Sequence, residues 1–252
     1  MKIGMCQTWM YPTIEENLEN IVKNIRECEK NRAELVIFPE CGLTGFHRKL
    51  PSQVNYETLA KSFKKILNCS KESNVSVIIG SPFIDTVNKN EIFNSALFFS
   101  PELEKPKITS KVGLTEVEHL YFTEGLTRKV FHIGKFNIGV IFCIEMDDKE
   151  DILNDFKDAK LDSIAWISYI NWNGKVNSQN KIDYQNSLDI SLALNVPIIN
   201  VNWANSINDN LMKGMGGSRF INNGKLIFEL EEDSEQLKII ETNDYCWIRE
   251  SL

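Results

Sequence analysis

Apolar and polar positions along the chain repeat with two different periods. Short apolar runs typical of β-strands are separated by longer stretches in which apolar residues recur with the helical period. Lys2–Gln7 alternates as a strand, and Thr13 with Glu16 has the sequence of a capping box at the start of a helix. The apolar face predicted for that helix carries Leu18, Ile21, Val22 and Ile25.

The rest of the first half follows the same alternation. Glu34–Glu40 (ELVIFPE) indicates a buried strand, and a helix is expected over Tyr56–Glu72. The strand SVIIGSPFI comes next, and FNSALFFS follows it closely enough to pair with it as an antiparallel neighbour. Lys105–Gly125 shows no regular period, so this middle segment is expected to be irregular.

The second half contains the most apolar strand candidate, Asn137–Glu145 (NIGVIFCIE). Helices are expected over Lys149–Ala159 and Ser178–Leu194, with the strand SIAWISYI between them, and Pro197 should end the second helix. The closing strands are PIINVNW, GGSRFIN, KLIFEL and QLKIIET. This order predicts an α/β fold in which mostly buried strands lie between helices. Because no Pro/Gly/Ser linker divides the chain, residues 1–252 are expected to form a single domain.

Composition and charge narrow the classes of function. Of the 252 residues 42% are hydrophobic, which suffices for one substantial core and excludes a disordered tail. The net charge of −7 disfavours phosphate backbones and anionic lipid, so no nucleic acid and no membrane is expected as a partner. The N-terminal MKIGMCQTWM lacks the charged-then-apolar order of a signal peptide, and a cytoplasmic location is expected.

Metal-binding and disulfide patterns are missing from the sequence. The six cysteines form no CxxC pair and have no nearby histidine at a ligand spacing, and the three histidines form no HExxH motif. We therefore expect reduced thiols, no metal and no cofactor.

Cys143 is the candidate nucleophile. It follows the apolar pair Ile141-Phe142 and precedes Glu145, so it is expected at the carboxyl end of a buried strand, where a side chain is both rigid and accessible. Read alone, its local sequence is more typical of a small core residue.

Glu40 and Lys111 are the other candidates for chemistry. Glu40 follows Pro39 at the end of an apolar strand, and a partly desolvated carboxylate there has the raised pKa that suits a general base. The alternatives are a solvated carboxylate at a strand end and, for Lys111, a surface charge in a small basic cluster.

The ordered set of motifs resembles the nitrilase (carbon–nitrogen hydrolase) superfamily along essentially the whole chain. No single motif is specific, but their order and spacing together are. The segments that carry the resemblance are Phe38-Pro39-Glu40, Leu43-Thr44-Gly45-Phe46, Asn94-Ser95-Ala96, Lys111, Glu118 to Phe122, Gly125, Cys143, Asn171-Trp172 and Gly216 to Ile221.

The resemblance implies a four-layer α-β-β-α sandwich and a thiol amidohydrolase acting on a small-molecule amide or carbamoyl substrate. Cys143 would form a thioester, and Glu40 would be its general base. Lys111 and the backbone N–H of Ile144 would stabilise the oxyanion. Glu118 resembles the family's second glutamate, which helps to hold the lysine. The resemblance also implies a homodimer, paired through helices that include the one after the nucleophile strand.

Substrate recognition is where this chain departs from the family. Many relatives have an arginine four residues after the cysteine, but this chain has Asp147, with Glu145, Asp148 and Glu150 nearby. If these acids face the pocket, anionic substrates should be disfavoured; if not, they form a solvated helix N-terminus. Asn171 and Trp172, together with Gly217-Ser218-Arg219, resemble the omega-amidase-type members, and Trp172 is expected to line the pocket.

Three other functions are compatible with the sequence. The same thioester could pass its acyl group to an amine, which would make the protein an acyltransferase. Cys143 could instead pair with His119 or His132 as a Cys-His hydrolase. The chain could also be a non-catalytic binding protein that keeps the fold.

Overall fold

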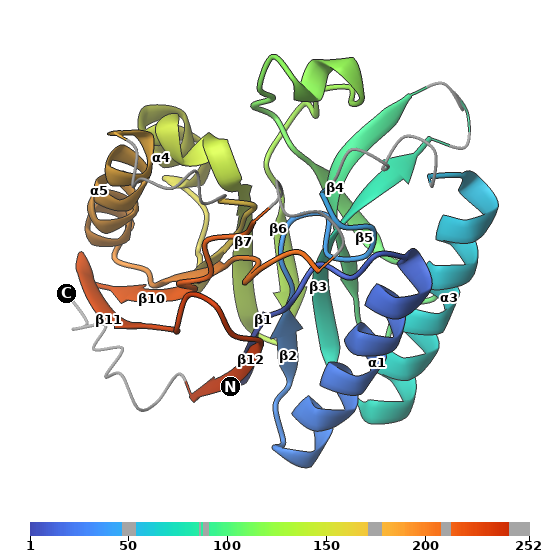
Figure 1. Cartoon of the computed structure of the whole chain (residues 1–252). Coiled ribbons are helices and arrows are strands. Elements are labelled where there is room, and N and C mark those ends of the chain that lie inside the picture. The colour runs from blue at the N-terminus through green and yellow to red at the C-terminus, as the bar shows by residue number, and fades with distance from the viewer. Residues whose placement is uncertain (47–53, 86, 88–90, 171–177, 208–212, 242–252) are drawn as a thin grey trace.

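Two β-sheets lie face to face in the computed structural model, which describes residues 1–46, 54–85, 87, 91–170, 178–207 and 213–241 (Figure 1). Across the described residues each sheet has six strands. The first sheet contains, in spatial order, β12 (Gln236–Glu241), β1 (Lys2–Gln7), β2 (Leu35–Ile37), β3 (Ser76–Ile84), β4 (Ile92–Phe99) and β5 (Lys107–Ser110). The second contains β11 (Lys225–Glu229), β10 (Arg219–Asn222), β9 (Ile198–Val201), β8 (Ser163–Ile167), β7 (Phe136–Phe142) and β6 (Val130–Ile133).

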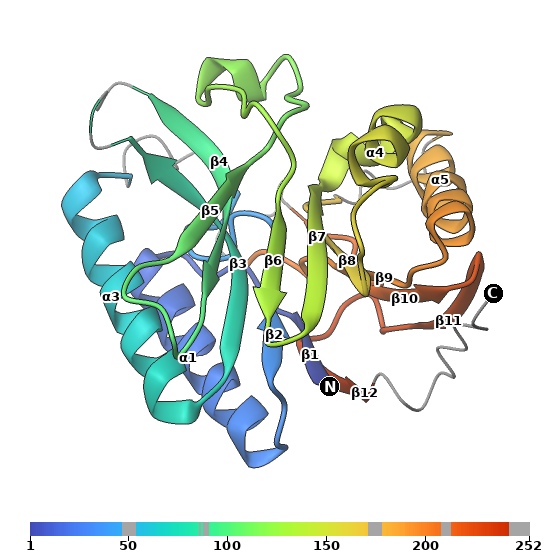
Figure 2. The same ribbon diagram turned by 180° about the vertical axis from the view of Figure 1, so that it is seen from behind.

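Helices cover the outer face of each sheet, as both ribbon views show (Figures 1 and 2). The helices α1 (Ile14–Lys30) and α3 (Tyr56–Ser73) pack on the first sheet, and α4 (Lys149–Phe156) and α5 (Ser178–Leu194) pack on the second. The predicted four-layer α-β-β-α sandwich is confirmed.

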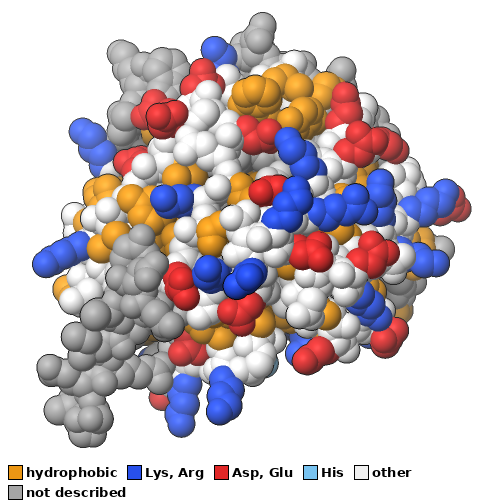
Figure 3. All heavy atoms as spheres, turned by 90° about the horizontal axis from the view of Figure 1, so that it is seen from below, with side chains coloured by type: hydrophobic (Ala, Val, Ile, Leu, Met, Phe, Trp, Pro, Cys, Tyr) orange, Lys and Arg blue, Asp and Glu red, His pale blue; other side chains and the backbone are white. Residues whose placement is uncertain are grey.

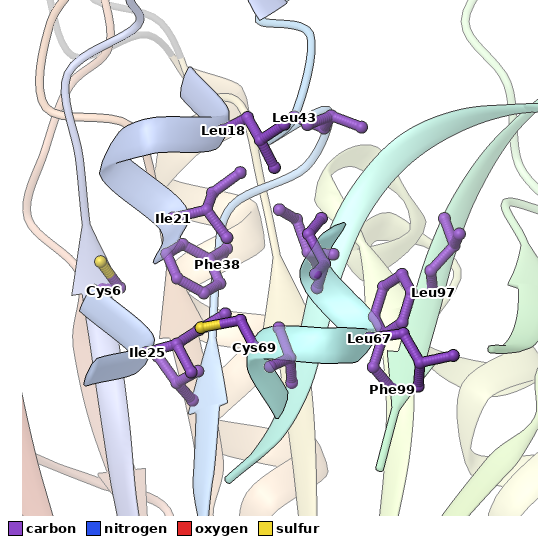
Figure 4. Close-up of a cluster of buried hydrophobic side chains, with 14 of the residues drawn as sticks. Cys6, Leu18, Ile21, Ile25, Phe38, Leu43, Leu67, Cys69, Leu97 and Phe99 are labelled. Atoms are coloured by element: carbon purple, nitrogen blue, oxygen red, sulfur yellow. The ribbon is translucent and has the colours of Figure 1, made fainter. Parts of the chain in front are cut away.

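The layers follow from the two-residue period of the strands. In β7, Ile138, Val140 and Phe142 face the first sheet, whereas Ile141 faces α4 and α5. In the first sheet Phe38, Leu97 and Phe99 belong to the outer cluster under α1 and α3, which Figure 4 shows packed against Ile21, Ile25 and Leu67. Apolar side chains on both faces of the strands therefore hold all four layers together.

The first helix begins where its sequence predicts. Thr13 accepts the backbone N–H of Glu16 at 3.2 Å, and Glu16 accepts the N–H of Thr13 at 3.1 Å, which completes the capping box. The buried Leu18, Ile21 and Ile25 lie on one face, as expected, with Val22 packed against the same cluster.

Several predicted boundaries were wrong. The strand expected over Glu34–Glu40 ends at Ile37, because Pro39 has no N–H for the ladder and the chain turns at residues 40–44. The strand expected over Asn137–Glu145 ends at Phe142, and Cys143 opens the 3₁₀ helix η2 (Cys143–Asp147). The segment expected to be irregular contains β5 and a second 3₁₀ helix, η1 (Glu118–Leu120).

Strand directions bring several strand ends to one edge of the sandwich. The neighbours β1, β2 and β3 are parallel, as are β7, β8 and β9, and β5 runs in the direction of β3 because both are antiparallel to β4. Carboxyl ends of such strands are the usual location of sites in open α/β sheets.

Charges on the face drawn in Figure 3 are mixed, with basic and acidic side chains interspersed among apolar atoms. In the part of the chain that the structure describes, no helix has the length and apolar character needed to cross a bilayer.

Candidate active site

Glu40 lies just beyond β2 with a side chain that is almost fully buried. Its Oε1 accepts hydrogen bonds from Lys111 Nζ at 2.9 Å and Asn94 Nδ2 at 2.7 Å, and its Oε2 accepts the backbone N–H of Tyr169 at 3.1 Å. The Glu40 carbonyl accepts the indole N–H of Trp203 at 2.8 Å. Both the carboxylate and the backbone of Glu40 are thus fixed.

Lys111 is buried although it is a lysine, and it follows β5 directly. Its ammonium donates to Glu40 Oε1 at 2.9 Å and to Glu118 Oε1 at 2.7 Å. Its backbone is held as well, because Lys111 N donates to Asn94 O and Gly125 N donates to Lys111 O. The sequence alternative of a surface charge is therefore wrong for Lys111.

Glu118 completes this buried cluster from η1. One oxygen binds Lys111, and the other accepts the backbone N–H of Thr115 at 2.9 Å. Asn94 also donates to Glu118 at 3.2 Å, so its amide group joins the two carboxylates. The motif Asn94-Ser95-Ala96 indicates the family, but the sequence alone does not predict these two hydrogen bonds of Asn94.

Cys143 is partly exposed at the start of η2. Its Sγ lies 3.4 Å from the carbonyl oxygen of Tyr169, and its own carbonyl accepts the indole N–H of Trp166 at 3.2 Å. Tyr169 thereby contacts Glu40 through its N–H and Cys143 through its carbonyl. No sequence motif pointed to Tyr169, whose contribution comes from its backbone.

The electrostatics of the cluster keep the cysteine protonated at rest. Burial raises the pKa of the Cys143 thiol well above its ordinary value, and the nearby Glu40 adds to this effect while Lys111 opposes it. Burial, together with Glu118, also raises the pKa of Glu40 against the opposing influence of Lys111. The thiol therefore needs a base to become a nucleophile, and the pKa of Glu40, a carboxyl group that acts electrostatically on this thiol, is itself raised.

Three of the other residues singled out in the sequence closely follow Cys143. Ile144 is the half-buried second residue of η2, and Asp147 ends that helix with its side chain partly buried. Glu145 is fully buried and points to backbone amides and Arg128, so it is not among the acids that could face a substrate. Asn171 and Trp172 lie outside the described residues.

The two histidines of the Cys-His alternative are engaged elsewhere. His119 is exposed and lies 3.5 Å from Glu124, and His132 on β6 lies 2.7 Å from Asn137. Within the described residues, no group of His, Cys, Asp and Glu side chains could hold a metal ion.

Comparisons with known proteins place this arrangement in a family. The carbon–nitrogen hydrolase family model matches residues 2–244. The chain belongs to the carbon–nitrogen hydrolase family. Its curated relatives are nitrilase-like, so this is the nitrilase superfamily that the motifs resembled.

The curated relatives are matched over part of their length. Nitrilase homolog 2 of Dictyostelium discoideum is 28% identical over 142 residues, which are 52% of this chain and 43% of that protein. An arylacetonitrilase of Arthroderma benhamiae is 24% identical over 135 residues, or 49% of this chain and 40% of that protein. These matches thus cover less than half of either relative.

Solved structures of an amidase and of an NAD+ synthetase share the fold. An amidase from Nesterenkonia sp. AN1, with acrylamide added to its active-site cysteine, has a TM-score of 0.83 at 14% identity, covering 96% of this chain and 92% of that one. A glutamine-dependent NAD+ synthetase from Acinetobacter baumannii has a TM-score of 0.82 at 19% identity, covering 94% of this chain and 44% of that one.

Proposed function

We propose that this carbon–nitrogen hydrolase is a thiol amidohydrolase that cleaves the C–N bond of a small linear amide or carbamoyl compound. The observation that carries the proposal is the convergence of one partly exposed cysteine, one buried ammonium and one buried carboxylate just beyond the ends of β7, β5 and β2. Glu40 and Lys111 are in direct contact, and both act electrostatically on Cys143.

In the first half of the reaction, Glu40 takes the thiol proton as Cys143 Sγ attacks the amide carbon. Lys111 and the backbone N–H of Ile144 stabilise the oxyanion, and one such donor contributes about 3–4 kcal/mol in well-studied hydrolases. The C–N bond then breaks, Glu40 returns the proton to the leaving nitrogen, and ammonia or an amine departs from a thioester.

In the second half, Glu40 takes a proton from water, which attacks the thioester. The C–S bond breaks, the acid departs and the proton returns to Cys143. One buried carboxylate thus serves both halves, which suits a group whose pKa is raised by burial.

Ammonia release from a panel of short amides, carbamoyl compounds and nitriles tests the proposal. Butyramide belongs in the panel because the Nesterenkonia amidase was captured with it. We expect turnover of at least one amide by the wild type and none by Cys143→Ala. Ammonia release that requires an added amine acceptor would indicate the acyltransferase, and equal activity of Cys143→Ala would refute a thioester route.

We further propose that the enzyme disfavours anionic substrates because of the negative charge of Asp147. If its carboxylate borders the substrate, neutral or amine-bearing amides should exceed dicarboxylic acid monoamides in kcat/KM by about tenfold, because like charges repel across a partly desolvated site. Asp147→Arg should then reverse the ranking, and an unchanged ranking would remove Asp147 as its cause.

A further inference from the structure

One buried carboxylate outside the proposed triad contacts the segments on both sides of the site. Glu145 Oε1 accepts the backbone N–H of Val112 at 2.6 Å and that of Gly113 at 3.3 Å. Its Oε2 accepts the N–H of Phe142 at 2.8 Å. Val112 directly follows Lys111 and Phe142 directly precedes Cys143, so one side chain connects the neighbours of two proposed catalytic residues.

These two segments belong to different sheets. Lys111 follows β5 of the first sheet, whereas Cys143 follows β7 of the second. Ladder hydrogen bonds act within a sheet, so they do not set the separation between the ammonium and the thiol. Hydrogen bonds from amide N–H groups to an ionised carboxylate are shorter and stronger than hydrogen bonds between neutral groups. The hydrogen bonds of Glu145 therefore link the two sheets effectively.

Arg128 supplies the positive charge that faces the Glu145 carboxylate. Its Nε lies 3.6 Å from Glu145 Oε2, and its side chain is only 4% exposed. Its Nη1 donates to Asp155 of α4 at 2.7 Å, which fixes the guanidinium from the other side. The buried carboxylate therefore has both hydrogen-bond donors and an opposite charge, the conditions under which a buried charge persists.

The backbone at Gly113 packs closely against the side chain of Glu145. A Cβ at Gly113 would lie 3.5 Å from Glu145 Cγ and 3.2 Å from Asp148 Oδ2, so the backbone at residue 113 approaches the acid closely. A helix-capping role would need only the Phe142 contact. The reach to Val112 and Gly113 requires the full length of the glutamate side chain.

We propose that Glu145 is a positioning residue that sets the separation between Cys143 and Lys111 by bridging the two sheets. The inference rests on the proposed function, because it assigns Glu145 to the same site. It adds a residue that acts on the chemistry without touching the substrate.

Glu145→Asp is the decisive variant because it keeps the charge facing Arg128 but shortens the reach by one methylene group. Glu145→Gln keeps the shape and removes the charge, but it leaves Arg128 buried beside a neutral group and risks misfolding. Glu229→Asp is the matched control, since Glu229 also pairs with an arginine, Arg219 at 2.8 Å, and lies on β11 at the edge of the second sheet.

Two readouts separate positioning from stability. The first is kcat and KM for ammonia release from butyramide, with thermal unfolding of each variant measured in parallel. The second is the rate at which acrylamide alkylates Cys143, followed by peptide mass mapping. In that step the sulfur adds to the terminal carbon of acrylamide, the C=C double bond becomes a single bond, and the thiol proton ends on the adjacent carbon.

For Glu145→Asp we expect kcat to fall by about ten- to a hundredfold with KM nearly unchanged, since misplaced catalytic groups cost rate rather than binding. Alkylation of Cys143 should slow as well, while the melting temperature stays near that of the wild type and Glu229→Asp behaves as wild type. The inference would be overturned if Glu145→Asp kept the kcat and the Cys143 alkylation rate of the wild type. It would also be overturned if the loss of kcat were no larger than the fraction of the variant that is unfolded.

Failure of the proposed function gives a different result. If Cys143→Ala is as active as the wild type, the thioester route is wrong whatever Glu145 does. If activity depends on Cys143 but not on the length of residue 145, only the positioning role is wrong. If no amide is turned over, the alkylation rate of Cys143 still decides the inference.

Discussion

At the scale of single residues, Lys111 brings one positive charge between the carboxylates of Glu40 and Glu118, and all three side chains are buried. Burial of charges is costly unless they are paired and hydrogen-bonded, and Asn94 and the Tyr169 N–H supply the remaining donors. Because the desolvation of these three charges offsets most of their mutual attraction, the cluster adds little to the free energy of unfolding. Its presence is better explained by the proposed catalytic role than by stability.

The first prediction concerns the proposed base. Glu40→Gln keeps the shape of the side chain but cannot take the thiol proton, so kcat should fall by about 10²–10⁴-fold. The measurement is ammonia release from butyramide. His119→Ala is the control, because His119 is exposed beside Glu124 and its loss should be mild. The reverse ranking of the two variants would favour the Cys-His alternative.

The second prediction concerns pH. Because burial raises the pKa of Glu40, its carboxyl group stays protonated to a higher pH than an ordinary glutamate. A protonated Glu40 cannot act as a base, so kcat/KM should be lost as pH falls through this raised pKa, above the ordinary value of about 4.3. A pH profile of kcat/KM with its acidic limb at or below that ordinary value would contradict the assignment.

At the scale of elements, sequence periodicity predicted most strands and helices, but it placed their ends less well. β1 and β3 were predicted with their observed bounds, as was α5. Strand β6 was not indicated, because Val130–Ile133 is short and only partly buried at a sheet edge. The residue pattern indicates which positions are buried, whereas strand ends depend on contacts from distant segments, such as the indole N–H of Trp203 that donates to the Glu40 carbonyl just beyond β2.

The same limit applies to the candidate site. Glu40, Lys111, Glu118 and Cys143 could be proposed from ordered motifs, and the structure brings them together. Tyr169 could not be proposed, because it acts through backbone atoms that any residue has. Glu145 was read as one of several acids near the pocket, since its partners Val112 and Gly113 are more than thirty residues away in sequence.

The third prediction belongs to α1. Thr13→Ala removes the side-chain acceptor of the capping box, so the free energy of unfolding should fall by about 1 kcal/mol. Activity should stay at the wild-type level because α1 packs on the outer face of the first sheet. Urea denaturation measures the effect, with Glu19→Ala on the exposed side of α1 as the control. Equal unfolding free energies for the two variants would argue against the cap.

At the scale of the whole molecule, the two-sheet sandwich explains why the site needs both halves of the chain. Glu40 and Lys111 come from the first sheet and Cys143 comes from the second. The apolar layer between the sheets, which includes Ile37, Phe98 and Val140, therefore helps to hold the three proposed catalytic residues in place relative to one another. Loosening this layer should reduce activity before it unfolds the protein.

The fourth prediction is a homodimer in solution, which remains a proposal drawn from the family. We expect light scattering at micromolar concentration to give twice the chain mass of 29.0 kDa. Leu192 is 60% exposed on α5, which contacts α4, the helix that the family's pairing would include, so Leu192→Glu should weaken the dimer if α5 takes part in that pairing. The matched control is Val117→Glu, which changes an apolar residue that is 62% exposed outside α4 and α5. A monomeric mass for the wild type would contradict the prediction.

The central claim is that Cys143 carries the acyl group of an amide substrate, and trapping that intermediate tests it most directly. Wild-type protein mixed with butyramide is quenched in acid during turnover, and peptide mass mapping locates any added butyryl group. The account predicts this group on the peptide containing Cys143, sensitive to hydroxylamine as a thioester is, and missing from Cys143→Ala. Turnover with the same butyryl adduct on another cysteine, or undiminished turnover by Cys143→Ala, would contradict it.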